Sequence, residues 1–450
     1  AQAIRLKPFG SNCLGAVCIS PIDSLSNPCA MASRANGQFE PFGTRIAHCE
    51  PAWYQGSSSP YYRDSHVQFR SLVRRFVEEE LKPHVDDWIA APGGYPRELH
   101  QRAYEVGVQG VLYPREWGGT RPDDFDAFHE LILWDELARV GGGGVLGQMS
   151  INSMALPPVM DFGPQDMRDL VCRPVVTGKK NISLAISEPT AGSDVAQIQC
   201  TAEKSADGKT YKVSGQKKWI TGGLMADWFT TAVRTGGTGM GGISLLLIDR
   251  ALPGVSVRKM QTQFDNSHNT TMVTLEDVVV PVECLIGQEG RGFKYIVENF
   301  NHERFLIATA TTREARLCYE EAVKHALTRR TFGQRLIEHQ LIRFKLAEMV
   351  RAIEATQDMV ERVAFQFASG VPTSRLGGAC ALLKVQASKT FEFAAREASQ
   401  IFGGSSIVKE GKGKLVERLY RGVRATAIPG GSEEILLDMA MREAMRSAKL

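Results

Sequence analysis

The spacing of the apolar residues changes twice along the chain. Up to about residue 180 they recur every three or four positions, and helices are expected before Pro83 and over 126–140. Residues 181–288 instead form short β-rich runs that are broken by Gly, Asp-Gly and Pro. The spacing of a helix then returns, and long helices are expected over 293–327, 339–369, 375–402 and 432–447. We therefore predict an α+β protein in which helical regions flank a compact β domain.

The length of 450 residues favours several domains, because single hydrophobic cores stop growing at roughly 250–300 residues. The first 49 residues are rich in Ser, Gly and Pro, hold four of the nine cysteines, and contain only Asp23 and Glu40 as acids. This composition is typical of a tail. The predicted parts are an irregular N-terminal tail (1–55), an N-terminal helical domain (56–180), a middle β domain (181–290) and a C-terminal helical domain (291–450).

Both ends of the chain resemble cellular addresses. The N-terminal segment contains arginine and few acids, as a mitochondrial transit peptide does, although it has no clear amphipathic helix. The last three residues, Ala-Lys-Leu, are close to the peroxisomal address Ser-Lys-Leu, a match short enough to arise by chance. We expect a peroxisomal or a mitochondrial-matrix location.

Charge and cysteine usage exclude several classes of function. The 53 basic and 50 acidic residues give a net charge of +3, and no long basic run with interleaved aromatics predicts nucleic-acid binding. The longest aliphatic run, ISLLLI at 243–248, is far shorter than the roughly 20 residues of a transmembrane helix. The nine cysteines form no CxxC pair, so we expect neither a metal site nor a disulfide framework. A protein for small ligands fits best.

The run GTGMGG at 237–242 satisfies the dinucleotide-binding pattern G-x-G-x-x-G. That pattern needs a strand before it and a helix after it, so that a pyrophosphate meets a helix N-terminus. Here a strand follows. We therefore predict a hairpin loop.

Two stretches of the β region have the composition of a ligand site. ISEPTAGSDVAQ at 186–197 is a turn rich in backbone donors, and GQKKWITGG at 215–223 contains Trp219 and Thr221. Strand alternation places these two side chains on one face, which suits a planar aromatic ligand with polar edges. The alternative interpretation is a loop beside a buried tryptophan.

Glu303 lies within NFNHERFLIATA at 299–310, in an otherwise apolar helical stripe. Three interpretations are open. It is a surface residue beside an ill-defined stripe, a structural partner of Arg304 or His302, or a proton acceptor in an apolar pocket. In the last case the apolar neighbours raise the pKa of the carboxyl by penalising its charged form.

From about residue 60 to 446 the chain resembles the acyl-CoA dehydrogenase family. The order of the shared motifs makes the resemblance specific. It implies an N-terminal helical domain, a β-barrel-like middle domain and a C-terminal helical bundle. The motifs are YPREWGGT (113–120), ISEPTAGSDVA, GQKKWITGG, the helix around NHERFLIA, RRTFGQRLIEHQ (329–340), QIFGG (400–404) and AIPGGSEEIL (427–436).

The resemblance implies bound FAD. By position, one group of residues matches those that line the flavin ring, with Ser193 reaching both flavin and substrate. A second group matches residues that contact the FAD of a neighbouring subunit or fit the same cofactor, which implies a homodimer or homotetramer. The first group is Leu184, Ile186, Ser187, Ser193, Trp219 and Thr221; the second is Arg329, Thr331, Phe332, Gln340, Gln400, Gly403, Gly404 and Glu433.

The family reaction needs a base that takes the α-proton of an acyl thioester while the β-hydride goes to the flavin. Many members place this glutamate in the loop before the last helix, where this chain has Pro429. Isovaleryl-CoA and long-chain members supply it from the helix position of Glu303, which we therefore expect to be the base. Glu433 and Glu434 compete for the role, although Ser432 resembles an N-cap that explains both acids.

Asn301 and Arg304 match family positions that hold the helix and the pantetheine of the substrate. The resemblance thus predicts a dehydrogenase that forms trans-2-enoyl-CoA and passes electrons to an electron-transferring flavoprotein. Two alternatives are an acyl-CoA oxidase that uses oxygen and an assembly protein that has lost turnover.

Overall fold

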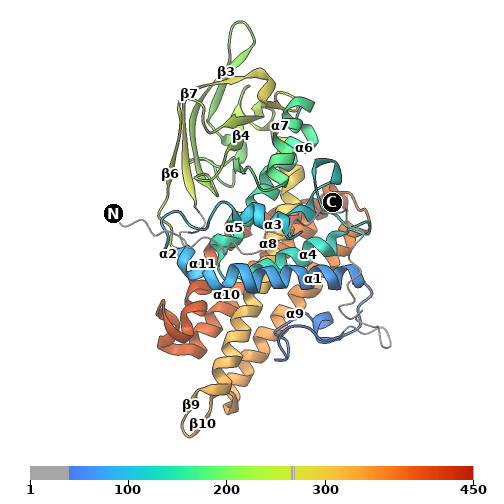
Figure 1. Cartoon of the computed structure of the whole chain (residues 1–450), viewed down its shortest axis with the longest axis vertical. Helices are drawn as coiled ribbons and strands as arrows, with labels where there is room; N and C mark the ends of the chain where they lie inside the picture. The colour runs from blue at the N-terminus through green and yellow to red at the C-terminus, as the bar shows by residue number, and fades with distance from the viewer. Residues whose placement is uncertain (1–39, 265–266, 268, 449–450) are drawn as a thin grey trace, which may run out of the picture.

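The computed structural model describes residues 40–264, 267 and 269–448. Residues 1–39 of the acid-poor leader and the last two residues of the Ala-Lys-Leu tripeptide therefore lie outside the described residues. Figure 1 shows the β domain at the upper end of the molecule, the N-terminal helices across its middle and the C-terminal helices below.

The N-terminal domain is helical, as predicted. After α1 the backbone continues through a wider helical turn over Val77–Leu81 to Pro83, where proline begins a new turn because it has no N–H to donate. The helices are α1 (Asp64–Phe76), α2 (Val85–Ala90), α3 (Leu99–Glu105), α4 (Ala127–Ala138), α5 (Gly143–Ala155), α6 (Pro157–Phe162) and α7 (Gln165–Val176).

The middle domain is one twisted sheet in the order β6-β7-β3-β2-β4-β5-β8, with β1 pairing in parallel with β4. In the described part of this domain β6 and β8 remain at opposite edges, so the expected barrel-like shape is wrong in one respect: the sheet is not closed. The strands are β1 (Ile182–Ala185), β2 (Thr201–Lys204), β3 (Thr210–Ile220), β4 (Trp228–Arg234), β5 (Ile243–Asp249), β6 (Val255–Lys259), β7 (Thr271–Pro281) and β8 (Leu285–Ile286).

The GTGMGG run lies in the connection between β4 and β5, which pair antiparallel from Arg234 and Ile243 outward. The hairpin prediction is confirmed. The strand β3 is longer than the short runs expected for this region. It has register shifts against β7 between Val213 and Gly215 and between Lys218 and Ile220.

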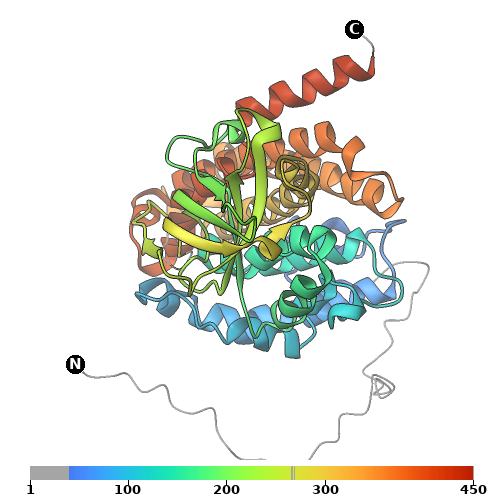
Figure 2. The ribbon, with the colours of Figure 1, turned by 90° about the horizontal axis from the view of Figure 1, so that it is seen from above.

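The C-terminal domain is a helical bundle around α8, which runs for 37 residues. The helix α11 was not among the predicted segments, although Val416, Leu419 and Val423 are buried at helical spacing and could have predicted it. Figure 2 shows α12 extending away from the body of the molecule. The helices are α8 (Gly292–Thr328), α9 (Gln340–Ala368), α10 (Gly377–Phe402), α11 (Lys414–Ala427) and α12 (Glu433–Ser447).

The segment just before residue 55, predicted as part of an irregular tail, is instead packed into the core. Trp53 and Tyr54 are almost fully buried, and Trp53 stacks on Tyr62 with ring centroids 3.9 Å apart. Glu50 is also buried and pairs with Arg139 and Arg313. The low acid content of the leader therefore says nothing about these residues, because they are held by long-range contacts.

Arg313 of α8 is at the centre of this buried ion network. Its Nε and Nη2 donate to Asp135 of α4 at 3.0 and 2.5 Å, and its Nη1 donates to Glu50 Oε2 at 3.1 Å. Glu136 pairs with Arg74 of α1. The network thus joins α1, α4 and α8 to the N-terminal segment.

His66, Asp126 and His129 bring three candidate metal-ligand atoms within 4.8 Å of one another in the described part of the chain. Their hydrogen bonds close the starts of α1 and α4: His66 Nδ1 accepts from the Arg63 N–H, and His129 Nδ1 from the Asp126 N–H. The Arg63 guanidinium lies 2.5 Å from Asp126. Because that positive charge opposes a bound cation, we interpret the group as helix caps.

Among the described residues, no helix has the length and apolar character needed to cross a membrane.

Candidate active site

Glu303 lies in the wall of a cavity between α5, α8 and α11, which we call the front cavity. Its volume is about 150 Å³. Thr221 from the end of β3 and Pro429 from the loop before α12 also line it. The three motifs that contain these residues are far apart in sequence, and the fold brings them to one space.

The carboxyl of Glu303 is buried, with 7% of the residue exposed. Asn299, one helical turn earlier, donates from Nδ2 to Glu303 Oε1 at 2.8 Å and to the Met154 carbonyl, also at 2.8 Å. Burial raises the pKa of Glu303 to about 7, while the charge of Arg304 and the hydrogen bond from Asn299 act in the opposite direction. A carboxyl that titrates near neutral pH can both take and release a proton.

Arg304 and Asn301 are buried and engaged in the protein itself. Arg304 donates from Nε to the Gly430 carbonyl and from Nη1 to Asn301 Oδ1, each at 3.0 Å, and Asn301 donates to the Thr373 carbonyl at 2.9 Å. These contacts fix the loop around Pro429 against α8. A pantetheine contact for either residue stays a prediction.

The acids of the C-terminal loop are placed differently from Glu303. Glu433 begins α12, and its Oε1 accepts a hydrogen bond from Ser388 at 3.0 Å. Ser432 occupies the predicted N-cap position, but within the described residues its side chain does not cap the helix N–H groups. Of these candidate bases, Glu303 alone belongs to the lining of the front cavity.

The two β-domain motifs contact each other through a buried ion pair. Lys217 donates from Nζ to Glu188 Oε1 at 2.7 Å and to the Ile186 carbonyl at 3.0 Å. The Lys218 N–H donates to the Ser187 carbonyl at 2.8 Å. Leu184 and Ile186 lie in or just after β1, and Ser193 is exposed in the turn that follows. The fold therefore holds the two motifs that carry the predicted flavin-facing residues against each other.

Trp219 departs from simple strand alternation. It has a φ of 67° and lies at the second register shift of β3, so the alternation expected from the sequence does not describe its backbone. Its side chain is 55% exposed, which rules out the alternative interpretation of a buried tryptophan. A large indole left open beside Thr221 suits a planar ligand.

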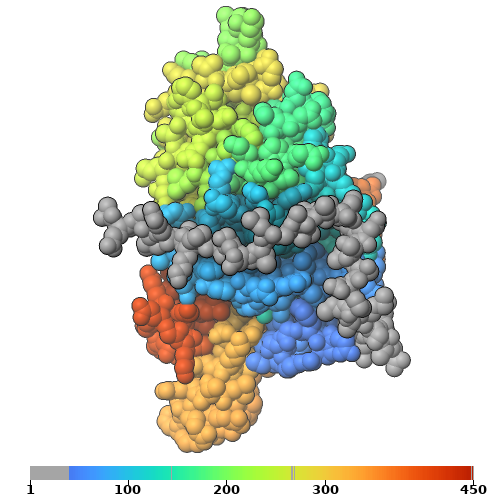
Figure 3. All heavy atoms as spheres, viewed as in Figure 1, coloured from blue at the N-terminus to red at the C-terminus, as the bar shows by residue number. Residues whose placement is uncertain are grey.

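The second predicted group lies at the other end of the molecule, except for Glu433, which begins α12 beside Ser388. Arg329 follows α8, and Thr331 and Phe332 belong to the hairpin of β9 (Arg330–Thr331) and β10 (Gln334–Arg335). This hairpin is at the lower tip in Figures 1 and 3, far from β3. Stacking of His325 on Phe402, with centroids 4.2 Å apart, brings the end of α10 to the same region. One chain therefore does not bring the two groups together.

Comparison with known proteins gives the family. Matching models are the acyl-CoA dehydrogenase N-terminal domain at residues 63–179, the middle domain at 183–278 and the C-terminal domain at 290–445. Acyl-CoA dehydrogenase apdG of Emericella nidulans is 36% identical over 90% of this chain and 96% of its own length. The chain belongs to the acyl-CoA dehydrogenase family.

Other acyl-CoA dehydrogenases agree in sequence and fold. Acyl-CoA dehydrogenase AFT10-1 of Alternaria alternata is 38% identical over 89% of this chain and 96% of its own length. The three-dimensional structure of butyryl-CoA dehydrogenase from Megasphaera elsdenii is 29% identical, covers 86% of this chain and 100% of that one, and has a TM-score of 0.80. The three-domain prediction is confirmed, and the protein is an oxidoreductase.

Acyl-CoA dehydrogenases bind FAD, and the exposed groups of this chain fit such a ligand. Phe332 is 96% exposed, and a Cβ added at Gly403 or Gly404 would meet nothing within 4 Å. Open backbone of this kind lets a flat or charged group approach closely. Gln340 and Gln400 are exposed on the same end of the bundle.

Sequence reasoning missed the partner that holds Glu303. Asn299 stands in the quoted helix motif at the spacing of one turn, so the sequence contained the information needed to propose it. Sequence reasoning also missed a set of ionisable residues that line a second cavity next to Glu303. They are Arg121, Glu130, Asp161, Glu298 and His302.

Proposed function

We propose that this chain oxidises an acyl-CoA thioester to a trans-2-enoyl-CoA and that Glu303 takes the α-proton. One observation carries the proposal: a buried carboxyl with a pKa near 7 lines the front cavity beside Thr221, where Pro429 occupies the alternative base position. Bound FAD supplies the acceptor for the β-hydride.

The roles of the residues follow from their contacts. Asn299 donates to Oε1 of Glu303, which leaves Oε2 for the proton. The hydrogen bonds of Arg304 to Gly430 and Asn301 hold Pro429 at the cavity and keep α8 in place. Ser193, Trp219 and Thr221 would contact the cofactor and the thioester, and the apolar residues Leu306 and Ile307 would face the acyl chain.

The proposed active unit is a homodimer or homotetramer. Arg329, Thr331 and Phe332 lie far from Trp219, so in this proposal they contact FAD bound to a second copy. Exposed apolar side chains on α12 support burial between copies, because a monomer rarely exposes so many. They are Ile435, Leu437, Met441 and Met445.

The proposed electron acceptor is an electron-transferring flavoprotein. One relative is the CarC subunit of the caffeyl-CoA reductase-Etf complex of Acetobacterium woodii, 29% identical over 83% of this chain. Hydrogen peroxide released with substrate under air would instead indicate an oxidase.

For location we propose peroxisomes, or the mitochondrial matrix. If the location is peroxisomal, deletion of the Ala-Lys-Leu tripeptide should leave the protein in the cytosol.

The test is anaerobic bleaching of the bound flavin by a panel of acyl-CoA thioesters that differ in chain length and branching. We expect a yellow protein with non-covalent FAD whose absorbance near the visible maximum falls with at least one thioester. A flavin-loaded protein that no thioester bleaches would favour an assembly role. A folded protein that takes up no flavin on reconstitution would refute the proposal.

A further inference from the structure

A second cavity lies on the opposite side of Glu303 from α11, and we call it the rear cavity. Its volume is about 620 Å³. Met154, Glu303 and Leu306 line both the front and the rear cavity. The Glu303 carboxyl is therefore part of the wall between the two spaces. Asn299, which holds Glu303 Oε1, lines the rear cavity.

The rear cavity is surrounded by ionisable side chains from four elements. Arg121 comes from the loop before α4, Glu130 from α4, Asp161 from α6, and Glu298 and His302 from α8. Burial and the nearby charge of Glu298 raise the pKa of Asp161, which His302 partly opposes. The rest of the lining is largely apolar and includes Phe125, Met160 and Phe162. The five ionisable side chains need polar partners, which water in the cavity can supply.

Two buried polar atoms of the lining point to water in this space. Tyr113 is 3% exposed, and within the described residues neither its hydroxyl nor the Arg121 Nε has a hydrogen-bond partner. Buried polar groups are normally satisfied by protein or by ordered water. The cavity volume is many times the roughly 30 Å³ that a water molecule occupies in the liquid. It can hold a connected set of waters.

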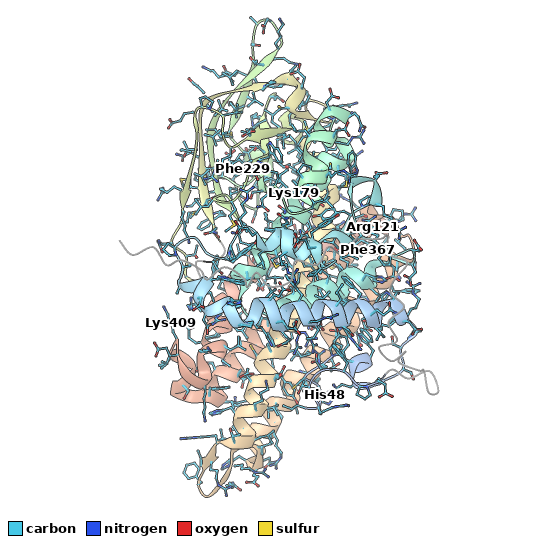
Figure 4. The ribbon with its side chains drawn as sticks, viewed as in Figure 1. His48, Arg121, Lys179, Phe229, Phe367 and Lys409 are labelled. Atoms are coloured by element: carbon cyan, nitrogen blue, oxygen red, sulfur yellow. The ribbon has the colours of Figure 1, made fainter. Side chains whose placement is uncertain are left out.

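His302 forms the outer end of this space. Its side chain is 46% exposed, its Nδ1 lies 3.6 Å from Glu130 Oε2, and its ring stacks on Phe367 with centroids 4.7 Å apart. Figure 4 labels Arg121 and Phe367 on the same side of the molecule. Burial lowers the pKa of His302, but the hydrogen bond and charge of Glu130 and the charge of Asp161 outweigh it and leave that pKa raised. An imidazole can both accept and release a proton, so His302 suits the outer end of a proton route.

We propose that the rear cavity is the route by which Glu303 returns its proton to solvent, with His302 and Glu130 as the outer relay. The inference rests on the proposed function. An acyl group and a cofactor bound at the front cavity would cover that side of Glu303, and the rear cavity would then be the side of the carboxyl in contact with water.

The proton and electron count is complete without another reactant. The Cα–H bond breaks, its proton goes to Glu303, and its electron pair forms the C=C bond while the Cβ hydride leaves to the flavin. Glu303 then gives its proton to water in the rear cavity, and the relay passes a proton to bulk solvent. The carboxylate is thereby restored for the next substrate.

The experiment follows deuterium loss from Cα under anaerobic conditions. Holoenzyme is mixed with the 2,2-dideuterated form of the thioester that bleaches the flavin fastest, and recovered acyl-CoA is analysed by mass spectrometry. Each reversible abstraction exchanges deuterium for hydrogen only if Glu303 reaches solvent before the reverse step. Washout per reduction event thus measures proton release with product bound.

The test variants are His302→Phe, which keeps the ring against Phe367, and Glu130→Gln, which keeps an oxygen acceptor for Trp134 Nε1. We expect washout to slow by about 10²-fold in both, the lower end of the range for a positioned acid–base group, with single-turnover flavin reduction changed less than about twofold. His84→Phe, an exposed histidine outside the rear cavity, is the matched control and should retain wild-type washout. FAD content confirms folding.

Unchanged washout in both variants, with normal flavin reduction, would overturn the route and leave the proposed function intact. Equal slowing of washout and flavin reduction would also overturn it, because the residues would then act in the abstraction step. A wild-type protein that no thioester reduces would refute the proposed function and the route together.

Discussion

Two buried ionisable residues on α8, ten residues apart in sequence, have opposite surroundings. Arg313 is fully enclosed and donates to two carboxylates, Asp135 and Glu50, at 3.1 Å or less. Glu303 is nearly as buried, yet its one described hydrogen bond is the neutral donor Asn299. The paired guanidinium has a pKa raised well above its usual range, by Asp135 and Glu50 against the effect of burial. The unpaired carboxyl has a pKa of about 7.

The comparison shows what decides whether a buried charge is structural or chemical. Opposite charges within hydrogen-bond distance fix the ionised state, and removal of a partner leaves an uncompensated charge. A carboxyl without such a partner instead shifts its pKa until it can exchange a proton near neutral pH. The helix α8 holds both kinds of buried charge because its two parts face different elements. Around Arg313, α1 and α4 supply arginines and carboxylates. Around Glu303, the apolar helix α5 faces α8.

The largest expected effect is on chemistry at Glu303. Glu303→Gln keeps size and polarity but removes the proton acceptor, so flavin reduction should slow by about 10²- to 10⁴-fold with FAD content retained. Stopped-flow absorbance measures the rate. Glu434→Gln, at an exposed acid in the first turn of α12, is the matched control and should stay near wild type. A fast Glu303→Gln beside an inactive, flavin-loaded Glu434→Gln would move the base to the C-terminal loop.

Removal of the paired charge should damage the fold. Arg313→Met leaves Asp135 buried without its cation and leaves Glu50 with Arg74 and Arg139 only, so the free energy of unfolding should fall by about 3–5 kcal/mol. Urea denaturation at pH 7 measures it. Arg351→Met, which removes an arginine with a side chain 71% exposed, should change stability by less than about 0.5 kcal/mol. A loss at Arg313 as small as that of the control would contradict the role of the network.

Removal of the unpaired charge should instead stabilise the fold at alkaline pH. The pKa of Glu303 in the folded state, about 7, lies above the usual 4.5, so wild-type stability declines as pH rises from 4.5 through 7. Glu303→Gln avoids this decline and should be more stable by about 1–3 kcal/mol at pH 8 but not at pH 4.5. Denaturation midpoints at both pH values provide the measurement. If wild type and Glu303→Gln were equally stable at pH 8, the ionised carboxylate of Glu303 would have favourable partners in the folded state that offset its burial.

The smallest expected effect is a shift of pH dependence. Asn299→Leu removes the donor that favours the ionised carboxyl, so the pKa of Glu303 should rise further. The rising limb of the rate of flavin reduction against pH should move to higher pH, with a loss of about two- to tenfold at pH 7, the size of one neutral hydrogen bond. An unchanged profile with normal FAD content would show that Asn299 serves the Met154 carbonyl alone.

The sequence predicted the long helices well because their apolar spacing is a local property. The expected segment 293–327 and the observed Gly292–Thr328 differ by one residue at each end. The same apolar spacing identified Glu303, because it is an acid within an otherwise apolar helical stripe. The burial of Glu50 and the lining of the rear cavity could not be predicted in this way, because Glu50, Arg121 and Asp161 meet their partners only through contacts between distant segments.

The ion pair between Lys217 and Glu188 has a consequence for local opening. Glu188 also accepts hydrogen bonds from the Gln199 and Cys200 N–H groups, and Lys217 reaches the Ile186 carbonyl. Neither motif can leave its place without breaking buried contacts of the other. Amide hydrogens of residues 186–200 and 215–220 should therefore exchange with solvent in one cooperative event, as a single local unfolding unit. A ligand that contacts either motif would slow exchange in both.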